Sequence, residues 1–150
     1  MNNYWKDGHY KELEKVKTFK EMLKIAFDIL ENMPKPITQV CGPISTGGKG
    51  SIEENLKMFP KAAEWLSRKG YNVFSQAPFE SPIERVKCNY SGYPYALLDE
   101  FYLPVFKSKL INIFAFLPGW QSSTGAKWEH EQAEKLGIEI LYLPEDWENQ

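Results

Sequence analysis

The sequence predicts an α/β protein in which helices cover both faces of a mainly parallel β-sheet. Short apolar runs suited to strands alternate with longer amphipathic segments suited to helices, and glycines and prolines separate them. Parallel strands need crossover connections, which are right-handed and place helices on both faces of a sheet. With 150 residues, of which 43% are hydrophobic, the chain is long enough to bury the core of one such domain.

The first expected element is a long amphipathic helix. Residues 11–33 place apolar side chains on one side and Lys and Glu on the other, and Pro34 and Pro36 end the pattern. The alternation of strands and helices begins only after these prolines. We therefore divide the chain into an N-terminal helical extension, 1–36, and an α/β domain, 37–150.

The α/β domain begins with an extended run at 37–41, which is followed by a glycine-rich loop. Ser51 then fits the N-cap of a helix, with Glu54 as its capping-box partner, and Gly70 fits the C′ position that ends it. Residues 83–94 have the weakest pattern and are expected to form a mobile loop. The other expected elements are a strand at 71–75, a helix at 96–106 broken at Pro104, a strand at 110–117, a helix at 125–136 and a strand at 138–143.

Composition and charge argue against several kinds of partner. A net charge of −2 gives no basic surface field, so we expect no nucleic-acid partner. No apolar run has the length that spans a bilayer, and the N-terminus lacks the apolar segment of a signal peptide, so we expect a cytoplasmic protein without membrane contact. Two cysteines and two histidines do not form a zinc-binding pattern, and we expect neither a metal nor a cofactor.

The candidate site is expected beyond the carboxyl ends of the strands, where parallel α/β sheets bind their ligands. Three loops follow strands there, 42–50, 76–82 and 118–125, and each carries glycine, proline or hydroxyl residues. The first loop contains a Gly-Gly-Lys-Gly run, which can wrap a phosphate with the lysine as counter-charge or can form a simple flexible turn. Its spacing is not that of a P-loop.

Glu129 is the main candidate for chemistry. On a helical wheel of residues 125–136 it shares a stripe with Ala126 and Ala133, and this stripe should face the sheet. A carboxylate on a buried face is costly, and the free N–H groups of the helix N-terminus offset part of that cost. An ionised carboxylate held rigidly beside a pocket is what a nucleophile at a sugar anomeric carbon requires. The alternative is an acid that caps its own helix or pairs with a lysine.

The turn before this helix supplies candidate binding groups. Ser122 and Ser123 can hold a phosphate or a ribose hydroxyl, or they can cap the helix. Trp120 can stack on a base or cover the edge of the core. Asp99 and Glu100, on the preceding predicted helix, are candidates for proton transfer or ribose contact, and the alternative is an exposed helix face.

Two segments together resemble the nucleoside 2-deoxyribosyltransferase superfamily. The first is Cys41-Gly42-Pro43-Ile44-Ser45-Thr46-Gly47-Gly48, and the second is Pro118-Gly119-Trp120, Ser123-x-Gly125-x-x-x-Glu129, Ala133 and Gly137. The similarity covers residues 37–143 and is strongest to uncharacterised members with a PGW…S.GA..E signature. The chain also resembles the nucleoside 5′-monophosphate N-glycosidase branch, which has the same Ser-x-Gly-x-x-x-Glu spacing.

The resemblance implies a fold, an activity and a set of site residues. The fold is a flavodoxin-like three-layer sandwich with a sheet of four to five strands, in a protein that forms homo-oligomers. The activity is cleavage or transfer of the N-glycosidic bond of a (deoxy)nucleoside or nucleoside 5′-monophosphate. Glu129 is then the nucleophile at C1′, and Ser123 holds a 5′-phosphate. The residues expected to bind substrate are Gly42, Pro43, Ile44, Ser45, Gly47, Gly48, Trp120, Ser122, Ser123, Gly125 and Asn112.

Two positions depart from the pattern of this superfamily. Asn112 stands where members usually have Asp, and Pro104 stands where they carry another acid. Asp99 or Glu100 can replace the missing acid from the previous helical turn. A non-catalytic nucleotide-binding or sensing module of the same fold is therefore the alternative function. A third possibility is a partner-binding domain that uses the helix at 11–33.

Overall fold

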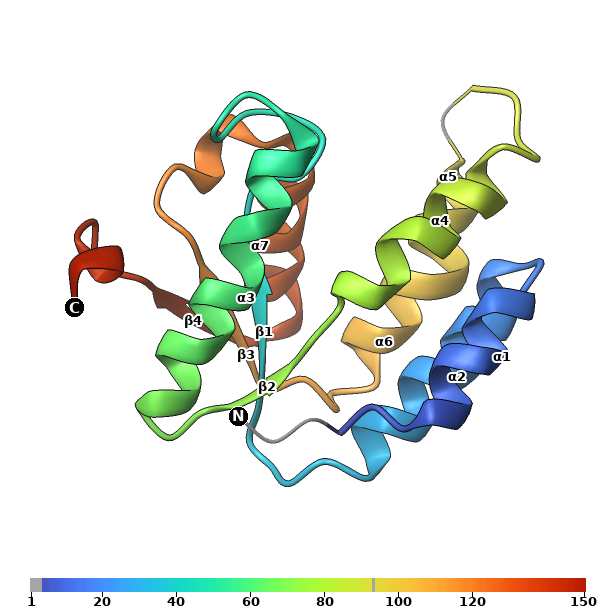
Figure 1. Cartoon of the computed structure of the whole chain (residues 1–150), viewed down its shortest axis with the longest axis horizontal. Coiled ribbons are helices and arrows are strands. Elements are labelled where there is room, and N and C mark those ends of the chain that lie inside the picture. Colours follow the sequence, from blue (N-terminus) through green and yellow to red (C-terminus); the bar gives the residue numbers. More distant parts are fainter. Residues whose placement is uncertain (1–3, 93) are drawn as a thin grey trace. The chain divides into compact units, whose positions relative to one another are not determined.

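The computed structural model describes residues 4–92 and 94–150, and the chain divides into two compact units (Figure 1). The sheet unit comprises Pro34–Ser75 and Ile111–Gln150. The helical unit comprises the N-terminal helices, up to Met33, and the segment Gln76–Leu110. In the described part of the chain, no helix is both long enough and apolar enough to cross a membrane.

A four-stranded parallel sheet forms the centre of the sheet unit. The strands are β1 (Ile37–Cys41), β2 (Asn72–Phe74), β3 (Ile113–Phe116) and β4 (Glu139–Tyr142), in the order β2-β1-β3-β4. All neighbouring pairs are parallel, and the register aligns Cys41 with Phe116 at the carboxyl ends of β1 and β3. The four strands predicted from the sequence are confirmed, and the last three are shorter than predicted at both ends.

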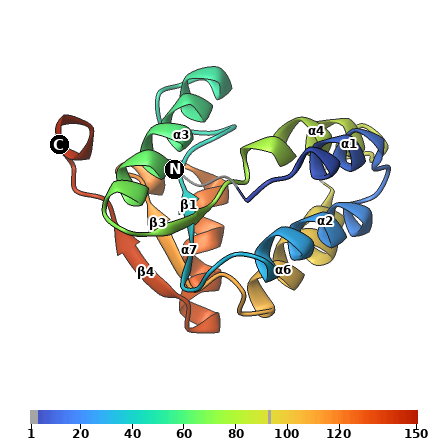
Figure 2. The ribbon, with the colours of Figure 1, turned by 60° about the horizontal axis from the view of Figure 1, so that its bottom comes forward.

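Helices cover both faces of this sheet, as predicted (Figure 2). The helix α3 (Ile52–Arg68) packs on the face that carries Val40 and Ala115. The helix α7 (Thr124–Leu136) lies over the opposite face, where its Glu129 contacts Gln39. Because neighbouring residues of a strand point to opposite faces, Gln39 and Val40 assign the two helices to opposite sides. The sheet unit is therefore a three-layer α/β sandwich of the flavodoxin-like kind.

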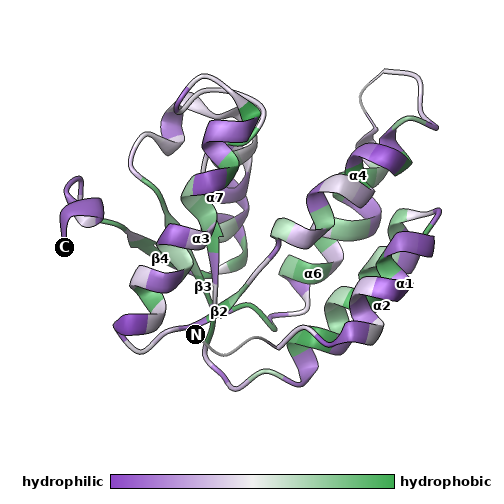
Figure 3. Ribbon diagram, in the orientation of Figure 1, coloured by the Kyte–Doolittle hydropathy of each residue, from purple (hydrophilic) through white to green (hydrophobic). Residues whose placement is uncertain are grey.

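The core beneath α3 follows from the spacing of apolar residues along that helix. Ser51 caps the helix by accepting the backbone N–H of Glu54, and Gly70 follows its end with a φ of +97°, both at the predicted positions. The buried residues Phe59, Ala62, Ala63 and Leu66 follow helical spacing, which gives α3 one apolar side, and its ribbon carries both hydrophobic and hydrophilic stretches (Figure 3). The buried residues of this core are Val40, Phe59, Ala62, Ala63, Trp65, Leu66, Val73, Ala115, Leu117, Leu143 and Trp147.

The helical unit begins with two helices where the sequence analysis predicts one. Instead of a helix over 11–33, the chain forms α1 (Asp7–Lys15) and α2 (Phe19–Glu31). Thr18 separates them, because its hydroxyl accepts the N–H of Glu21 and so starts a new helix. The prediction was wrong because apolar residues continue on both sides of this cap, and their spacing alone does not reveal the interruption.

The prediction of a mobile loop at 83–94 is wrong for the first half of this segment, which is helical. The short turn η1 (Ala77–Phe79) leads directly into α4 (Glu80–Lys87), so most of the predicted loop 76–82 is also helical and belongs to the helical unit. A helix of eight residues contains too few turns for its apolar spacing to be recognised. Tyr93 and residues 1–3 lie outside the described residues.

The predicted helix at 96–106 does not break at Pro104. It runs through α5 (Tyr95–Leu97), a π turn η2 (Leu98–Tyr102) and α6 (Leu103–Lys107). The N–H of Leu103 donates to the carbonyl of Leu98, and Pro104 follows this wider turn near the start of α6. The predicted break was wrong because a missing N–H is tolerated where the helical hydrogen-bond pattern has just changed.

Glu80 makes the stability of the fold depend on pH. Burial at the start of α4, and to a lesser degree the charge of Glu84, raises the pKa of Glu80 from 4.5 to about 7, and Lys87 opposes this rise. Between these two pH values the unfolded chain has released its proton, whereas the folded chain retains it. The free energy of unfolding therefore falls as the pH rises from about 4.5 to about 7.

We predict that Glu80→Gln removes this pH dependence. The variant should match the wild type at pH 4, but at pH 8 its free energy of unfolding should be higher by about 1–3 kcal/mol. Urea unfolding at both pH values measures the difference. Glu12→Gln, at an exposed position of α1, is the control and should change the stability by less than about 0.5 kcal/mol. A Glu80→Gln variant that gains no stability at pH 8 would contradict the role assigned to burial.

Candidate functional site

The carboxyl ends of β1 and β3 bring the first and third predicted loops together (Figure 1). The backbone N–H of Gly48 donates to the hydroxyl of Ser122 at 2.9 Å. In the other direction, the N–H of Thr124 donates to the hydroxyl of Thr46 at 3.0 Å. These two hydrogen bonds join loops 42–50 and 118–125, which we call the loop pair.

Asn55 holds loop 42–50 from the first turns of α3. Its side-chain nitrogen donates to the carbonyls of Ile44 at 2.9 Å and Gly47 at 3.2 Å, and its side-chain oxygen accepts the N–H of Lys49 at 2.8 Å. These three bonds explain how a polar side chain is buried at this position. Asn55 was not among the predicted site residues, although an amide on the inward side of a predicted helix is a signal that could have identified it.

Close packing requires glycine at three positions of this loop, and at one of them, Gly47, a Cβ would clash with the backbone of Ser122. A Cβ at Gly42 would lie 2.6 Å from Cδ1 of Leu117, and a Cβ at Gly48 would lie 2.5 Å from Oδ1 of Asn55. In this structure the glycine-rich run is therefore a turn packed against its neighbours. The other predicted binding residues of the loop are Pro43, which is buried, Ile44, which is partly buried, and Ser45 and Gly47, which are exposed.

Glu129 faces the sheet, as the helical wheel predicts. The neighbouring residues on its stripe, Ala126 and Ala133, are fully buried. Oε2 of Glu129 accepts a hydrogen bond from Nε2 of Gln39 at 3.0 Å, and the residue itself is partly buried. The cap of α7 is Ser123, so the carboxylate does not serve as the N-cap. An acid on the sheet side of α7 thus lies beside the carboxyl half of β1, next to the loop pair.

Cys41 lies on the same face of β1, two residues after Gln39. Its side chain is fully buried, and its Sγ lies 3.7 Å from Nε2 of Gln39. Burial, and after it the charge of Glu129, raises the pKa of the Cys41 thiol well above its ordinary value of 9.0. The thiol therefore stays protonated at neutral pH, and a protonated buried thiol is a poor nucleophile.

The two serines of the turn form hydrogen bonds within the protein. Oγ of Ser123 accepts the N–H of Ala126 at 3.1 Å, and Ser123 is buried. The hydroxyl of Ser122 donates to the carbonyl of Gly119 at 2.7 Å. Gly125, in the first turn of α7, is exposed. Of the two roles that the sequence leaves open for the serines, the structure shows helix capping at Ser123.

Trp120 belongs to an aromatic cluster at the carboxyl ends of β3 and β4. Its ring stacks on His130, with the ring centroids 4.3 Å apart and an angle of 7° between the planes. The centroids of Phe116 and Tyr142 lie 5.1 and 5.9 Å from that of His130. Nε2 of His130 lies 2.6 Å from the hydroxyl of Tyr142, and Nδ1 lies 3.2 Å from the carboxylate of Glu134. Trp120 therefore packs at the edge of the core, and its partners His130 and Tyr142 were not among the predicted site residues.

Three other predicted residues lie in other segments of the chain, Asn112 in the sheet unit and Asp99 and Glu100 in the helical unit. Asn112 lies before β3, at the end of the sheet away from the loops, and its Oδ1 accepts the N–H of Ile37 at 2.8 Å. Asp99 and Glu100 lie in the π turn of the helical unit. There Asp99 is exposed, and Glu100 forms an ion pair with Lys20 at 3.6 Å. Asn112 thus supports strand pairing, while the role of the two acids stays a prediction from the sequence.

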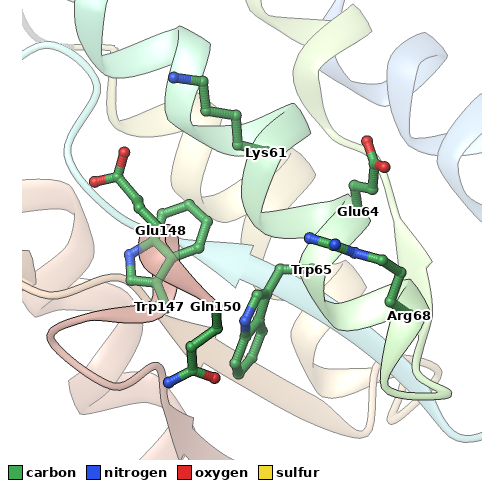
Figure 4. A pocket seen from close by; sticks show the side chains of 7 residues that line it. All are labelled: Lys61, Glu64, Trp65, Arg68, Trp147, Glu148 and Gln150. Atoms are coloured by element: carbon green, nitrogen blue, oxygen red, sulfur yellow. The ribbon is translucent and has the colours of Figure 1, made fainter.

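A shallow pocket of about 300 Å³ lies elsewhere in the sheet unit, between α3 and the C-terminal turn η4 (Trp147–Asn149) (Figure 4). It lies on the α3 side of the sheet, whereas Glu129 lies on the α7 side. The side chains that line it are those of Lys61, Glu64, Trp65, Arg68, Trp147, Glu148 and Gln150. No residue predicted to bind substrate lines this pocket. Over residues 4–92 and 94–150, no three His, Cys, Asp or Glu side chains gather in a way that could hold a metal ion.

Comparison with known proteins places the chain in a family. A family model described as a domain of unknown function (DUF4406) matches residues 38–142. The match begins in β1 and ends in β4, so it includes both loops of the loop pair and Glu129. None of the curated proteins matches the chain.

We predict that Asn55→Ala loosens loop 42–50 and destabilises the sheet unit. The change removes three hydrogen bonds and should lower the free energy of unfolding by about 2–4 kcal/mol. Urea unfolding followed by tryptophan fluorescence measures the loss. Asn89→Ala, at an exposed position, is the matched control and should change the stability by less than about 0.5 kcal/mol. If Asn55→Ala unfolds at the same urea concentration as the wild type, the loop does not depend on this side chain.

Proposed function

Because the chain belongs to this family of unknown function, its activity has to be inferred from its site, and we propose that it cleaves or transfers N-glycosidic bonds. The proposed substrate is a nucleoside, a deoxynucleoside or a nucleoside 5′-monophosphate, with Glu129 as the nucleophile. The hydrogen bond from Gln39 carries the proposal, since it turns a partly buried carboxylate toward the sheet beside the strand ends. The resemblance to the nucleoside 2-deoxyribosyltransferase superfamily supports the same role for Glu129. The proposed enzyme works in the cytoplasm as a homo-oligomer.

The proposed reaction has two displacement steps at the same carbon. A carboxylate oxygen of Glu129 attacks C1′ of the sugar while the bond from C1′ to the base nitrogen breaks, and the base leaves with the bonding electrons and takes up a proton. Water then attacks C1′ of the glycosyl-enzyme ester, loses a proton and releases the sugar together with the free carboxylate. A second base in place of water gives transfer. The proton lost by the acceptor balances the proton taken up by the first base.

The loop pair supplies groups for the remainder of the substrate. Ser45 and Lys49 are exposed on loop 42–50, where a hydroxyl and an ammonium group suit a phosphate. Ser123 accepts one backbone N–H, and a serine hydroxyl in that position keeps its own hydrogen for donation to a phosphate oxygen. The N-terminus of α7 favours a negative charge at the same place. Asp99 and Glu100 stay candidates for proton transfer or ribose contact.

A nucleotide-binding or sensing module without catalysis is the second candidate function. Asn112 favours it, because an amide stands where the superfamily usually has an acid, and an amide does not transfer protons at neutral pH. The side chain of Asn112 is also engaged with the backbone of Ile37. A protein of this kind keeps the loop pair as a binding site and does not turn its ligand over.

We predict that the protein releases a free base from one or more members of a panel of nucleosides and 5′-monophosphates. Glu129→Gln should lower this rate by on the order of 10³-fold or more, because the amide cannot form the glycosyl ester. Chromatography of the products measures the rate, and addition of a second base separates transfer from hydrolysis. Glu131→Gln is the matched control: Glu131 lies on the same helix, is exposed and pairs with Lys135. It should keep the wild-type rate to within about twofold.

The outcomes separate the two candidate functions. Base release that persists unchanged in Glu129→Gln would rule out the role assigned to this acid. If the wild type releases no base but nucleotides raise its melting temperature, the binding module is the better description. A ligand at about 100 times its Kd should stabilise the fold by about 2.7 kcal/mol. Absence of both base release and a melting shift would contradict both candidates.

A further inference from the structure

Gln39 is a buried polar residue in the middle of β1 with two contacts at the proposed site. Its backbone pairs with Phe74 and Phe114 on the neighbouring strands, and the residue is 2% exposed. Its Nε2 donates to Oε2 of Glu129 at 3.0 Å and to Sγ of Cys41 at 3.7 Å. Both hydrogens of the amide nitrogen therefore have an acceptor, which offsets the cost of burying them.

Chemistry determines the direction of the bond between Gln39 and Glu129. An ionised carboxylate has no hydrogen to donate, so the amide nitrogen must face it and the amide oxygen must point elsewhere. A donor that faces a carboxylate favours the ionised form over the acid. Because β1 lies between two paired strands, the backbone that carries this donor is held on both sides.

We propose that Gln39 positions the nucleophile: its amide fixes the orientation of the Glu129 carboxylate and favours its ionised form for the attack on C1′. This inference rests on the proposed function. A neutral donor suits the role, because a cationic partner would bind the carboxylate more tightly and make it less nucleophilic. Gln39 is a positioning residue in this scheme, since it acts on the substrate only through Glu129.

Cys41 fits the same arrangement. A thiolate here would place a second negative charge next to Glu129, but burial and that carboxylate together raise the pKa of Cys41. The thiol of Cys41 therefore stays neutral and adds no negative charge beside Glu129. The amide of Gln39 can then direct its stronger hydrogen bond to the carboxylate and its weaker one to sulfur.

Gln39→Met tests the proposal in the full chain. Methionine has a similar length and suits a buried strand, but it has no N–H donor. We expect kcat for base release to fall by about 10–100-fold, while KM changes by less than about threefold. The acidic limb of the pH profile of kcat should move to higher pH by about one unit, because the ionised form of Glu129 has lost its donor.

Thr38→Val is the matched control for this variant. Thr38 is the neighbour of Gln39 in β1, is fully buried and points to the opposite face. Within the part of the chain that the structure describes, its hydroxyl has no hydrogen-bond partner, so valine should replace it without loss of stability. Its kcat and pH profile should equal those of the wild type.

Nuclear magnetic resonance tests the contact independently of base release. In the ¹⁵N-labelled wild type, the side-chain amide hydrogens of Gln39 should change their chemical shift as Glu129 titrates. The change should be absent in Glu129→Gln. If Gln39→Met does not fold, this measurement alone tests the contact between Gln39 and Glu129. An amide signal that does not respond to pH in the wild type would overturn the proposal.

The kinetic outcomes distinguish this inference from the proposed function. If Gln39→Met keeps the wild-type kcat and pH profile while Glu129→Gln is inactive, the positioning role is overturned and the proposed function stands. If the wild type releases no base from any substrate, the proposed function fails and the positioning role fails with it. A rise in KM with unchanged kcat would also overturn the inference, because it would make Gln39 a substrate-binding residue.

Discussion

The parallel pairing of β1 with β3 is the constraint on which the candidate site depends. The register aligns Cys41 with Phe116, so the chain leaves both strands at the same edge of the sheet, and the two loops that follow have to meet there. Gly42 leaves the room that this approach needs. The hydrogen bond from Gly48 to Ser122 then joins residues that are 74 positions apart in the sequence. An antiparallel arrangement of the same two strands would send their loops to opposite edges.

Buried amides give the sheet unit much of its specific geometry. Asn55 connects α3 to three backbone groups of one loop, and Gln39 connects β1 to Glu129 on α7. The two helices cover opposite faces of the sheet, so each face has an amide that links a helix to the neighbouring β1 strand or its loop. Apolar packing tolerates small shifts, whereas a buried amide without its partners is costly. These contacts therefore favour one arrangement of the loop pair and of Glu129.

The sequence predicts the two units with different success, for a physical reason. In the sheet unit, each strand is a short apolar run between turn residues, and the caps Ser51 and Gly70 act within one turn of the helix that they bound. In the helical unit, the errors arise where the helical pattern is interrupted or is short. Thr18 starts a new helix inside a continuous apolar pattern. Pro104 follows a π turn, which local residue preferences do not predict.

The sequence by itself determined the order of elements in the sheet unit, the fold class and the side of α7 on which Glu129 lies, because these depend on spacing within a few residues. Only the tertiary structure determined the hydrogen-bond partner of that carboxylate. Gln39 is 90 positions away, and it reaches Glu129 only through the strand order and the pleat of β1. The same holds for Asn112, which the structure places at the far end of the sheet from the loops. A local pattern shows which way a side chain faces, whereas its partner depends on which strands are neighbours and in what register.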